Sequence, residues 1–194
     1  MRRGIALILV GVVIGLALAE IAWLPGRSAP VPLASDGPAQ PSPSTALPSP
    51  RRPGLPDPRL TPGAVNPDVT AASIEETICM AGWTAKVRPP SAYTSALKLV
   101  QIVEYGYADT DPRHYQEDHL VALELGGAVR DPRNLWPQPK TALLPDGTVI
   151  GAGEKDDLED ELRRRVCAGT MALDEAQRKI AGDWIAAWQA IGEA

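Results

Sequence analysis

The chain has 194 residues, of which 44% are hydrophobic, 22% are charged and 5% are aromatic, with no Phe. This length allows one ordinary domain with extensions, and the composition can build a core but excludes a polytopic membrane protein. The 20 Pro residues are unevenly placed, since twelve of them lie between Pro25 and Pro62. The chain therefore divides into a head at residues 1–24, a Pro-rich linker at 25–62 and a globular domain at 63–194.

The head has the pattern of an export signal. Arg2 and Arg3 precede an uncharged apolar run, and Ala17 to Ala19 offer a small-residue cleavage site. Left uncleaved, the run through Leu24 would be about 20 residues long, which is just enough to span a bilayer. A cleaved signal peptide and a signal anchor both remain open. Because the two Arg favour a cytoplasmic N-terminus, we expect the domain to be extracytoplasmic, either secreted or anchored to the membrane.

The linker at 25–62 combines Pro with Ser, Ala, Gly and Arg. Such a segment cannot bury a core and favours extended polyproline conformers, so we expect a disordered, semi-rigid spacer. The alternative is a ligand for a Pro-binding domain.

The domain at 63–194 is acidic, with 21 Asp and Glu against 13 Lys and Arg and a formal charge of −8. It lacks the basic excess of a general nucleic-acid binder. The even cysteine count, Cys79 and Cys167, predicts a disulfide in an exported chain, with two buried thiols as the alternative. Neither Cys has a C-x-x-C companion, so we do not expect them to bind metal.

The hydrophobic pattern predicts an α+β fold, mostly helical around one hairpin. The expected elements are helices at 71–80, 91–106, 153–169 and 173–191, extended chain at 82–90, strands at 115–125 and 134–138, and a loop or minor hairpin at 141–151. Pro137 is expected to end the second strand. Three helices have apolar residues at helical spacing that should face the core: Ala96, Leu99, Val100 and Val103; Leu158, Leu162 and Val166; and Ile180, Trp184, Trp188 and Ile191.

One of the two histidines, His119, follows an acidic residue, Asp118. In a regular strand these two side chains would point to opposite faces, so they can share a site only if the strand is twisted or bulged. The glycine pair Gly126-Gly127 permits a sharp turn, after which Asn134 could lie across from them. The other histidine, His114, is expected to be a solvated loop residue.

A hairpin followed by a helix could hold one divalent metal between them. Asp118 would bind the ion through oxygen. His119, neutral near pH 7, could deprotonate a water molecule. The metal would stabilise the charge that develops on the leaving oxygen or on the phosphoryl group.

The run D-H-L-V-A-L-E-L-G-G, followed by N-L-W-P, resembles the hairpin half of the ββα-metal motif of the HNH nuclease family. The resemblance covers roughly Tyr115 to Gly169. It implies that Asp118 binds the metal, that His119 is the general base, and that Asn134 holds the base and the hairpin. The wider domain resembles a group of small exported bacterial proteins related to that family, on the residues Cys79, Trp83, Lys155-Asp156, Cys167 and the segment N-L-W-P-Q-P.

The chain departs from the family at the helix. The family usually supplies a final His or Asn there as a second metal ligand, and this helix has neither. A carboxylate could substitute, because oxygen ligands suit Mg, Mn or Ca rather than Zn, and Asp156 is the choice by position. Lys155 and Glu159, at i and i+4, are expected to pair on the helix surface.

The resemblance implies an exported, metal-dependent endonuclease that hydrolyses nucleic-acid phosphodiester bonds. Basic residues would contact the phosphates: Arg130, Arg133, Lys140 and the run Arg163 to Arg165. The alternative is a catalytically degenerate envelope module of the same fold that binds a protein or cation partner, which the acidic charge favours. A hydrolase acting on another phosphodiester is a third reading. The head would add a membrane contact if it stays uncleaved.

Overall fold

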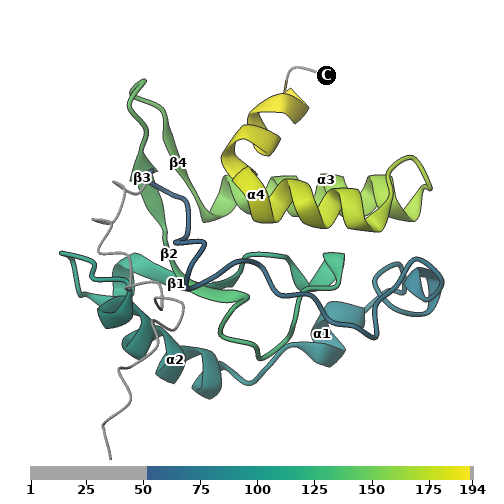
Figure 1. Ribbon diagram of the computed structural model, residues 1–194, viewed down its shortest axis with the longest axis horizontal. Coiled ribbons are helices and arrows are strands. Elements are labelled where there is room, and N and C mark those ends of the chain that lie inside the picture. The colour runs from purple at the N-terminus through teal and green to yellow at the C-terminus, as the bar shows by residue number, and fades with distance from the viewer. Residues whose placement is uncertain (1–51, 193–194) are drawn as a thin grey trace, which may run out of the picture. The chain divides into compact units, whose positions relative to one another are not determined.

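The structure is a computed structural model that describes residues 52–192 (Figure 1). The predicted export signal and most of the predicted linker lie outside these residues. The described residues belong to the second of two units, which spans residues 46–194. Among the described residues, no helix combines the length and the apolar character needed to cross a membrane.

The described chain mixes helices with two small antiparallel sheets, as an α+β fold requires. In chain order the elements are the 3-10 helix η1 (Ile74–Glu76), α1 (Trp83–Val87), α2 (Ser91–Glu104), the 3-10 helix η2 (Pro112–His114), β1 (Tyr115–His119), the 3-10 helix η3 (Leu123–Leu125), β2 (Leu135–Pro139), β3 (Thr141–Leu143), β4 (Val149–Gly151), α3 (Ala152–Cys167) and α4 (Leu173–Gly192).

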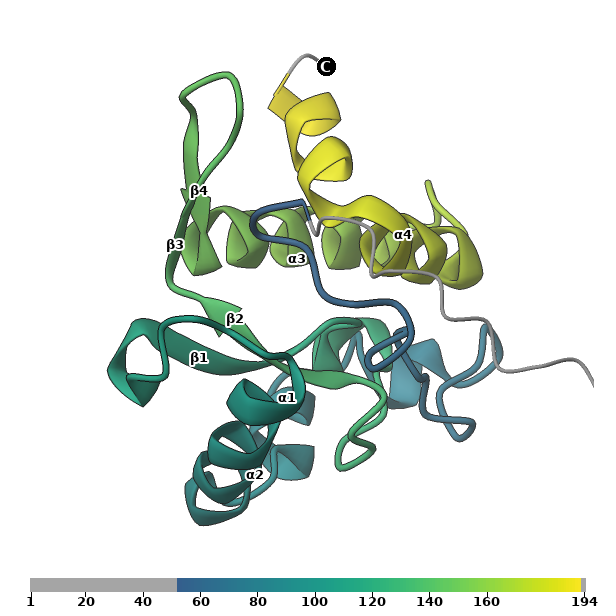
Figure 2. The ribbon, with the colours of Figure 1, turned by 60° about the vertical axis from the view of Figure 1, so that its left-hand side comes forward.

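The pair β1–β2 lies between two layers of helix. Both ribbon views place α2 on one side of it and α3 with α4 on the other (Figure 1, Figure 2). The core fills the space toward α3 and α4 with buried side chains such as Trp136, Leu158, Leu162, Ile180 and Trp184. The second pair, β3–β4, is a small hairpin that leads directly into α3, which agrees with the minor hairpin that the sequence allowed.

The segment predicted to be extended at 82–90 contains a helix, α1. The helix begins after Gly82, whose φ of 81° is the left-handed region that glycine tolerates, and it ends before the pair Pro89-Pro90. A helix of five residues is too short to show a helical period, so the sequence pattern does not distinguish it from extended chain. Where a helix was predicted at 71–80, the structure has only the single 3-10 turn of η1.

The strand predicted at 115–125 ends at His119, and the chain then turns into η3. The run from Leu120 to Leu125 is apolar without alternation, so its pattern cannot distinguish a strand from a buried turn of helix. The second strand continues through Pro137 to Pro139 instead of ending at Pro137. A two-stranded sheet leaves the outer edge of β2 unpaired, and proline is tolerated where its missing N–H would face that edge.

The core-facing stripe expected on α2 is wrong. The four residues predicted to be buried are exposed: Ala96, Leu99, Val100 and Val103. The helix instead buries Gln101 and Ile102, and Gln101 Nε2 donates a hydrogen bond to the carbonyl of Leu135 at 2.8 Å. The helix is oriented by this polar contact with β2, which a count of apolar spacing cannot reveal.

The stripe predicted for α4 is confirmed, because Ile180 and Trp184 are buried and Trp188 packs against the core. The helix bends at Asp183, whose φ of −153° and ψ of 86° are not helical. Trp184 Nε1 donates a hydrogen bond to the carbonyl of Gly54 at 2.9 Å. The described part of the predicted linker therefore packs on the domain, and the folded region begins before residue 63.

The predicted disulfide between Cys79 and Cys167 is confirmed, with the two Cα atoms 5.6 Å apart. It links the chain between η1 and α1 to the last residue of α3. Arg163 reinforces this junction, because its Nε donates a hydrogen bond to the carbonyl of Ile78 at 2.8 Å. The first elements of the domain are thereby held against the helix that follows the hairpin.

Candidate functional site

The loop between β1 and β2 is held closed by Asn134, which is fully buried. Asn134 Oδ1 accepts a hydrogen bond from the backbone N–H of Val121 at 2.9 Å. Its Nδ2 donates to the carbonyls of Val121 and Ala128, at 3.0 and 3.1 Å. Gly127 lies so close that an added Cβ would be 1.8 Å from the Val121 carbonyl oxygen. Asn134 thus holds the loop backbone, and it makes no hydrogen bond to His119.

His119 is the last residue of β1 and is only 6% exposed. Its Nε2 lies 3.0 Å from the carbonyl oxygen of Val129, so Nε2 carries the proton and donates it to this bond. Nδ1, which makes no hydrogen bond with the described residues, is left as the proton acceptor. Burial lowers the pKa of His119 and, with the charges of Arg88 and Lys155, outweighs the bond to Val129 and the charge of Asp118, which raise it. The imidazole is therefore neutral near pH 7.

Asp118 and His119 lie on opposite faces of β1. Across the pair β1–β2, Asp118 stands opposite Trp136 and His119 stands opposite Leu135, and directly opposed residues share a face. No bulge interrupts the register. The bulge that would turn both side chains to one face is absent from this strand pair.

The partner of Asp118 on α3 is Lys155, whose side chain is 1% exposed. The ammonium lies 2.8 Å from Asp118 Oδ2, forms an ion pair with Glu159, and donates a hydrogen bond to the carbonyl of His119 at 2.9 Å. Burial lowers the pKa of Lys155, but the two carboxylates outweigh it and hold the pKa above its usual value. The pair of Lys155 with Glu159 is therefore buried, not on the helix surface as the sequence suggested, and burial raises the pKa of Glu159 to about 7.

Asp156, the other expected ligand, is an exposed residue of α3. Burial, aided by the negative charge of Asp118, raises the pKa of Asp156, so the two carboxylates lie within electrostatic reach of each other. Across residues 52–192, however, no group of three or more His, Cys, Asp or Glu could hold a metal ion. Asp118 is already bound to an ammonium group. The residues as folded do not fit a divalent metal at Asp118.

A second acidic residue of β1, Glu117, is a buried carboxyl without a counterion in contact. Neither carboxyl oxygen has a hydrogen-bond partner among the described residues. Burial raises the pKa of Glu117 to about 8, and the charge of Asp118 adds to the shift while Lys98 opposes it. The group is therefore mostly protonated at pH 7.

Most of the basic residues expected to contact phosphate are engaged elsewhere. Three of them form ion pairs with nearby carboxylates: Arg133, Arg164 and Arg165. Arg163 bonds the backbone between η1 and α1, as described above. Exposed cations remain at Arg130, which lies 5.7 Å over the ring of Tyr93, and at Lys140. Arg88, which sequence reasoning did not single out, is a third exposed cation, and its charge acts on His119.

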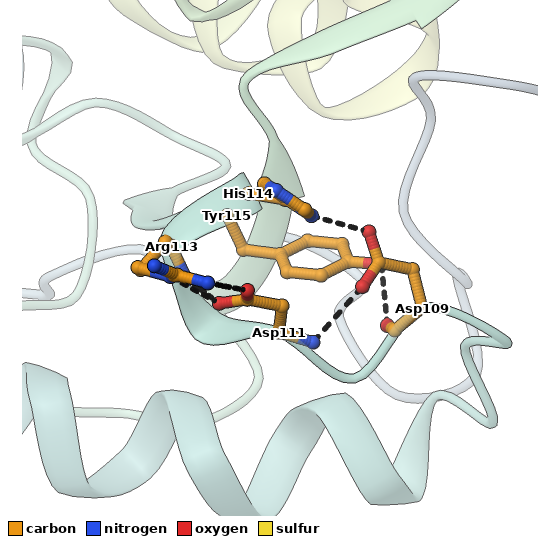
Figure 3. Close-up of polar contacts among 5 residues, drawn as sticks. All are labelled: Asp109, Asp111, Arg113, His114 and Tyr115. Atoms are coloured by element: carbon orange, nitrogen blue, oxygen red, sulfur yellow. Dashed lines mark hydrogen bonds and ion pairs between the residues drawn. The ribbon is translucent and has the colours of Figure 1, made fainter.

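His114 lies before β1 and its side chain is 62% exposed, as expected of a solvated residue. It is not isolated, however, because Nδ1 lies 2.6 Å from Asp109 Oδ2 (Figure 3). Beside it, Tyr115 donates its hydroxyl to the carbonyl of Asp109 at 2.7 Å, and Arg113 pairs with Asp111. These contacts organise the entry into β1, at the opposite end of the strand from His119.

Two features of this site escaped sequence reasoning. The carbonyl of Val129 orients the His119 ring, and a backbone acceptor has no side-chain signature. The burial of Lys155 did have a signal, because Lys155 precedes Leu158 and Leu162 at helical spacing and so lies on the buried face of α3. A charged residue on an apolar stripe indicates a buried partner.

Comparisons of the chain with protein-family models, with curated proteins and with solved structures found no match.

Proposed function

We propose that this domain is an HNH-like hydrolase that cleaves nucleic-acid phosphodiester bonds outside the cytoplasm, with His119 as the general base. The observation that carries the proposal is the hydrogen bond between His119 Nε2 and the Val129 carbonyl. This bond selects the tautomer in which Nδ1 accepts a proton. The antiparallel pair β1–β2, with α3 on its Asp118 face, supports a ββα arrangement of the HNH type.

In this proposal His119 Nδ1 takes a proton from a water molecule as the water oxygen attacks phosphorus. The phosphorus–oxygen bond to the leaving group then breaks, the leaving oxygen takes a proton from solvent, and His119 returns its proton to water. Because the pKa of His119 is lowered, the imidazole is neutral at pH 7 and can accept a proton. Asn134 acts as a positioning residue, because it holds the loop that carries the Val129 carbonyl. The exposed cations Arg88 and Arg130 would meet the phosphate backbone.

The test is cleavage of supercoiled plasmid, single-stranded DNA and RNA by the full-length chain and by His119→Ala. Loss of a general base typically slows a reaction by about 10²- to 10⁴-fold, so we expect the cleavage rate of His119→Ala to be at least about 100-fold lower than that of the wild type. His114→Ala is the matched control and should stay within about twofold of the wild type, because its side chain is exposed at the other end of β1. Equal cleavage by His119→Ala and the wild type would contradict the proposal.

A second candidate function is a non-catalytic envelope module that uses the same fold to bind a protein partner. The observation that favours it is the ion pair of Asp118 with Lys155, which neutralises the carboxylate that the HNH resemblance assigns to a metal. The acidic charge of the domain also suits a basic protein surface better than nucleic acid. Absence of cleavage by correctly folded wild-type protein on all three substrates would select this candidate.

A further inference from the structure

The ammonium group of Lys155 lies among three oxygen atoms. They are Asp118 Oδ2 at 2.8 Å, the carbonyl oxygen of His119 at 2.9 Å, and Glu159 Oε1. The ammonium donates hydrogen bonds to the His119 carbonyl and to Glu159, and its contact with Asp118 is an ion pair. The Lys155 side chain is 1% exposed, so the charge is shielded from solvent and balanced within the protein.

Two carboxylates and a backbone carbonyl are also the ligands that Mg, Mn and Ca take from proteins. Their metal–oxygen distances are about 2.0–2.6 Å, shorter than the contacts of an ammonium nitrogen. A divalent ion and the Lys155 ammonium would therefore compete for one position between Asp118 and Glu159.

We propose that the Lys155 ammonium is the resident cation of this site and takes the place of a divalent metal. The native chain therefore binds no divalent ion at Asp118, and removal of the ammonium creates a divalent-cation site from Asp118, Glu159 and the His119 carbonyl. The proposal concerns the same site as the proposed hydrolase but does not require catalysis.

The position of Lys155 also explains how a site without metal keeps its shape. The ammonium joins α3 to the last residue of β1 through the His119 carbonyl, and it holds Asp118 toward the helix. A bound metal would join a hairpin and a helix in the same way. Lys155 is buried, so it acts as a positioning residue and does not touch substrate.

The experiment measures Mn²⁺ binding by electron paramagnetic resonance and the thermal midpoint with and without Mn²⁺, on the full-length chain. The wild type should show no Mn²⁺ bound at Asp118 and no shift of its thermal midpoint. Lys155→Ala should be less stable without Mn²⁺, because two buried carboxylates repel each other. Its midpoint should rise with Mn²⁺, by about 8 °C at a hundredfold excess over Kd. Combining Asp118→Asn with Lys155→Ala should abolish this rise of the thermal midpoint.

Lys179→Ala is the matched control, because Lys179 forms an i,i+4 pair with Glu175 that is exposed. It should respond to Mn²⁺ no more than the wild type. Wild-type binding of Mn²⁺ that disappears in Asp118→Asn would overturn the proposal. If Lys155→Ala does not fold alone, folding on addition of Mn²⁺ supports the proposal. Lys155→Gln, which keeps most of the aliphatic side chain, is then measured in the same way. If neither variant binds Mn²⁺ or is stabilised by it, the proposal is overturned.

The outcome is separable from that of the proposed hydrolase. A wild type that cleaves no nucleic acid would leave the cation proposal intact, because its readouts are binding and stability. Conversely, Mn²⁺ binding at Asp118 of the wild type would remove the cation proposal and leave His119 as the proposed base. If both proposals hold, cleavage persists in the presence of a chelator.

Discussion

Glu117 and Asp118 are neighbours on β1, and their buried carboxyl groups have different surroundings. Asp118 forms an ion pair with a cation, Lys155. Glu117 has no hydrogen-bond partner among the described residues and keeps its proton instead. Alternation along the strand sends the two side chains to different faces, so one lysine cannot serve both.

Glu117 makes the stability of the fold depend on pH. Its pKa of about 8 in the folded state exceeds the ordinary value of about 4.3 that the unfolded chain would have. The contribution of Glu117 to stability is therefore complete below pH 4.3 and is lost as the pH rises through 8. We expect Glu117→Gln, which stays neutral, to gain up to about 3 kcal/mol over the wild type at pH 7 and little at pH 4.5.

Urea unfolding across this pH range checks the prediction. Glu175→Gln serves as the control, because Glu175 is half exposed and its ion pair with Lys179 is a loose one of 3.6 Å. It should change the pH profile by less than about 0.5 kcal/mol. A Glu117→Gln profile parallel to that of the wild type would show that Glu117 is not buried.

At the scale of elements, the conformation of the loop between β1 and β2 depends on close contacts within the loop more than on which amino acids the loop contains. Asn134 satisfies the backbone of Val121 and Ala128, and Gly127 lets the chain pass next to the Val121 carbonyl. The Gly pair suggested only a turn. The reason for glycine at position 127 is contact with a segment that lies across the loop.

Gly127→Ala should open this loop. A Cβ at 127 would lie 1.8 Å from the Val121 carbonyl oxygen and 2.7 Å from Asn134 Nδ2, so the hydrogen bonds of Asn134 must break or shift. We expect a loss of roughly 3 kcal/mol or more in the free energy of unfolding. Hydrogen exchange should also show reduced protection of the Val121 amide.

Gly153→Ala is the matched control, because a Cβ there meets nothing within 4 Å and the residue lies in α3. This change should be neutral or should stabilise by up to about 1 kcal/mol, since alanine is the better helix former. Equal effects of the two substitutions would refute the close contact at Gly127.

At the scale of the whole molecule, long-range bonds join the start of the described chain to its end. The disulfide Cys79–Cys167 spans 88 residues. Trp184 in α4 bonds the carbonyl of Gly54, and the exposed Arg52 pairs with Asp183 at the bend of the same helix. The hairpin and its helices are thus enclosed by contacts between distant parts of the sequence.

The disulfide should contribute much of the stability. Closing a loop of this size lowers the entropy of the unfolded chain by an amount worth about 4–5 kcal/mol. We expect the double variant Cys79→Ala/Cys167→Ala to unfold at correspondingly lower urea concentration. Reductant should destabilise the wild type and leave the double variant unchanged. A wild type insensitive to reductant under unfolding conditions would contradict the prediction.

Much of the fold could be read from local pattern. The helices α2, α3 and α4, the pair β1–β2 and the Cys79–Cys167 bridge were all predicted, because periodicity, glycine position and cysteine count are properties of the chain itself. The place of Asn134 after the turn suggested that it could lie across from Asp118 and His119, and its side chain bonds the loop backbone at Val121 and Ala128. The roles assigned to Asp118, His119 and Asn134 stay predictions.

What the tertiary structure alone decided is which groups meet. The exposed apolar face of α2, the helix at Trp83–Val87 and the buried ammonium of Lys155 all depend on surfaces that come from elsewhere in the chain. Asp118 illustrates the reason: a carboxylate attracts a lysine or a metal alike, and the sequence around it permits both. Only the packing of α3 against β1 places Lys155 within 2.8 Å and makes the cation a part of the protein.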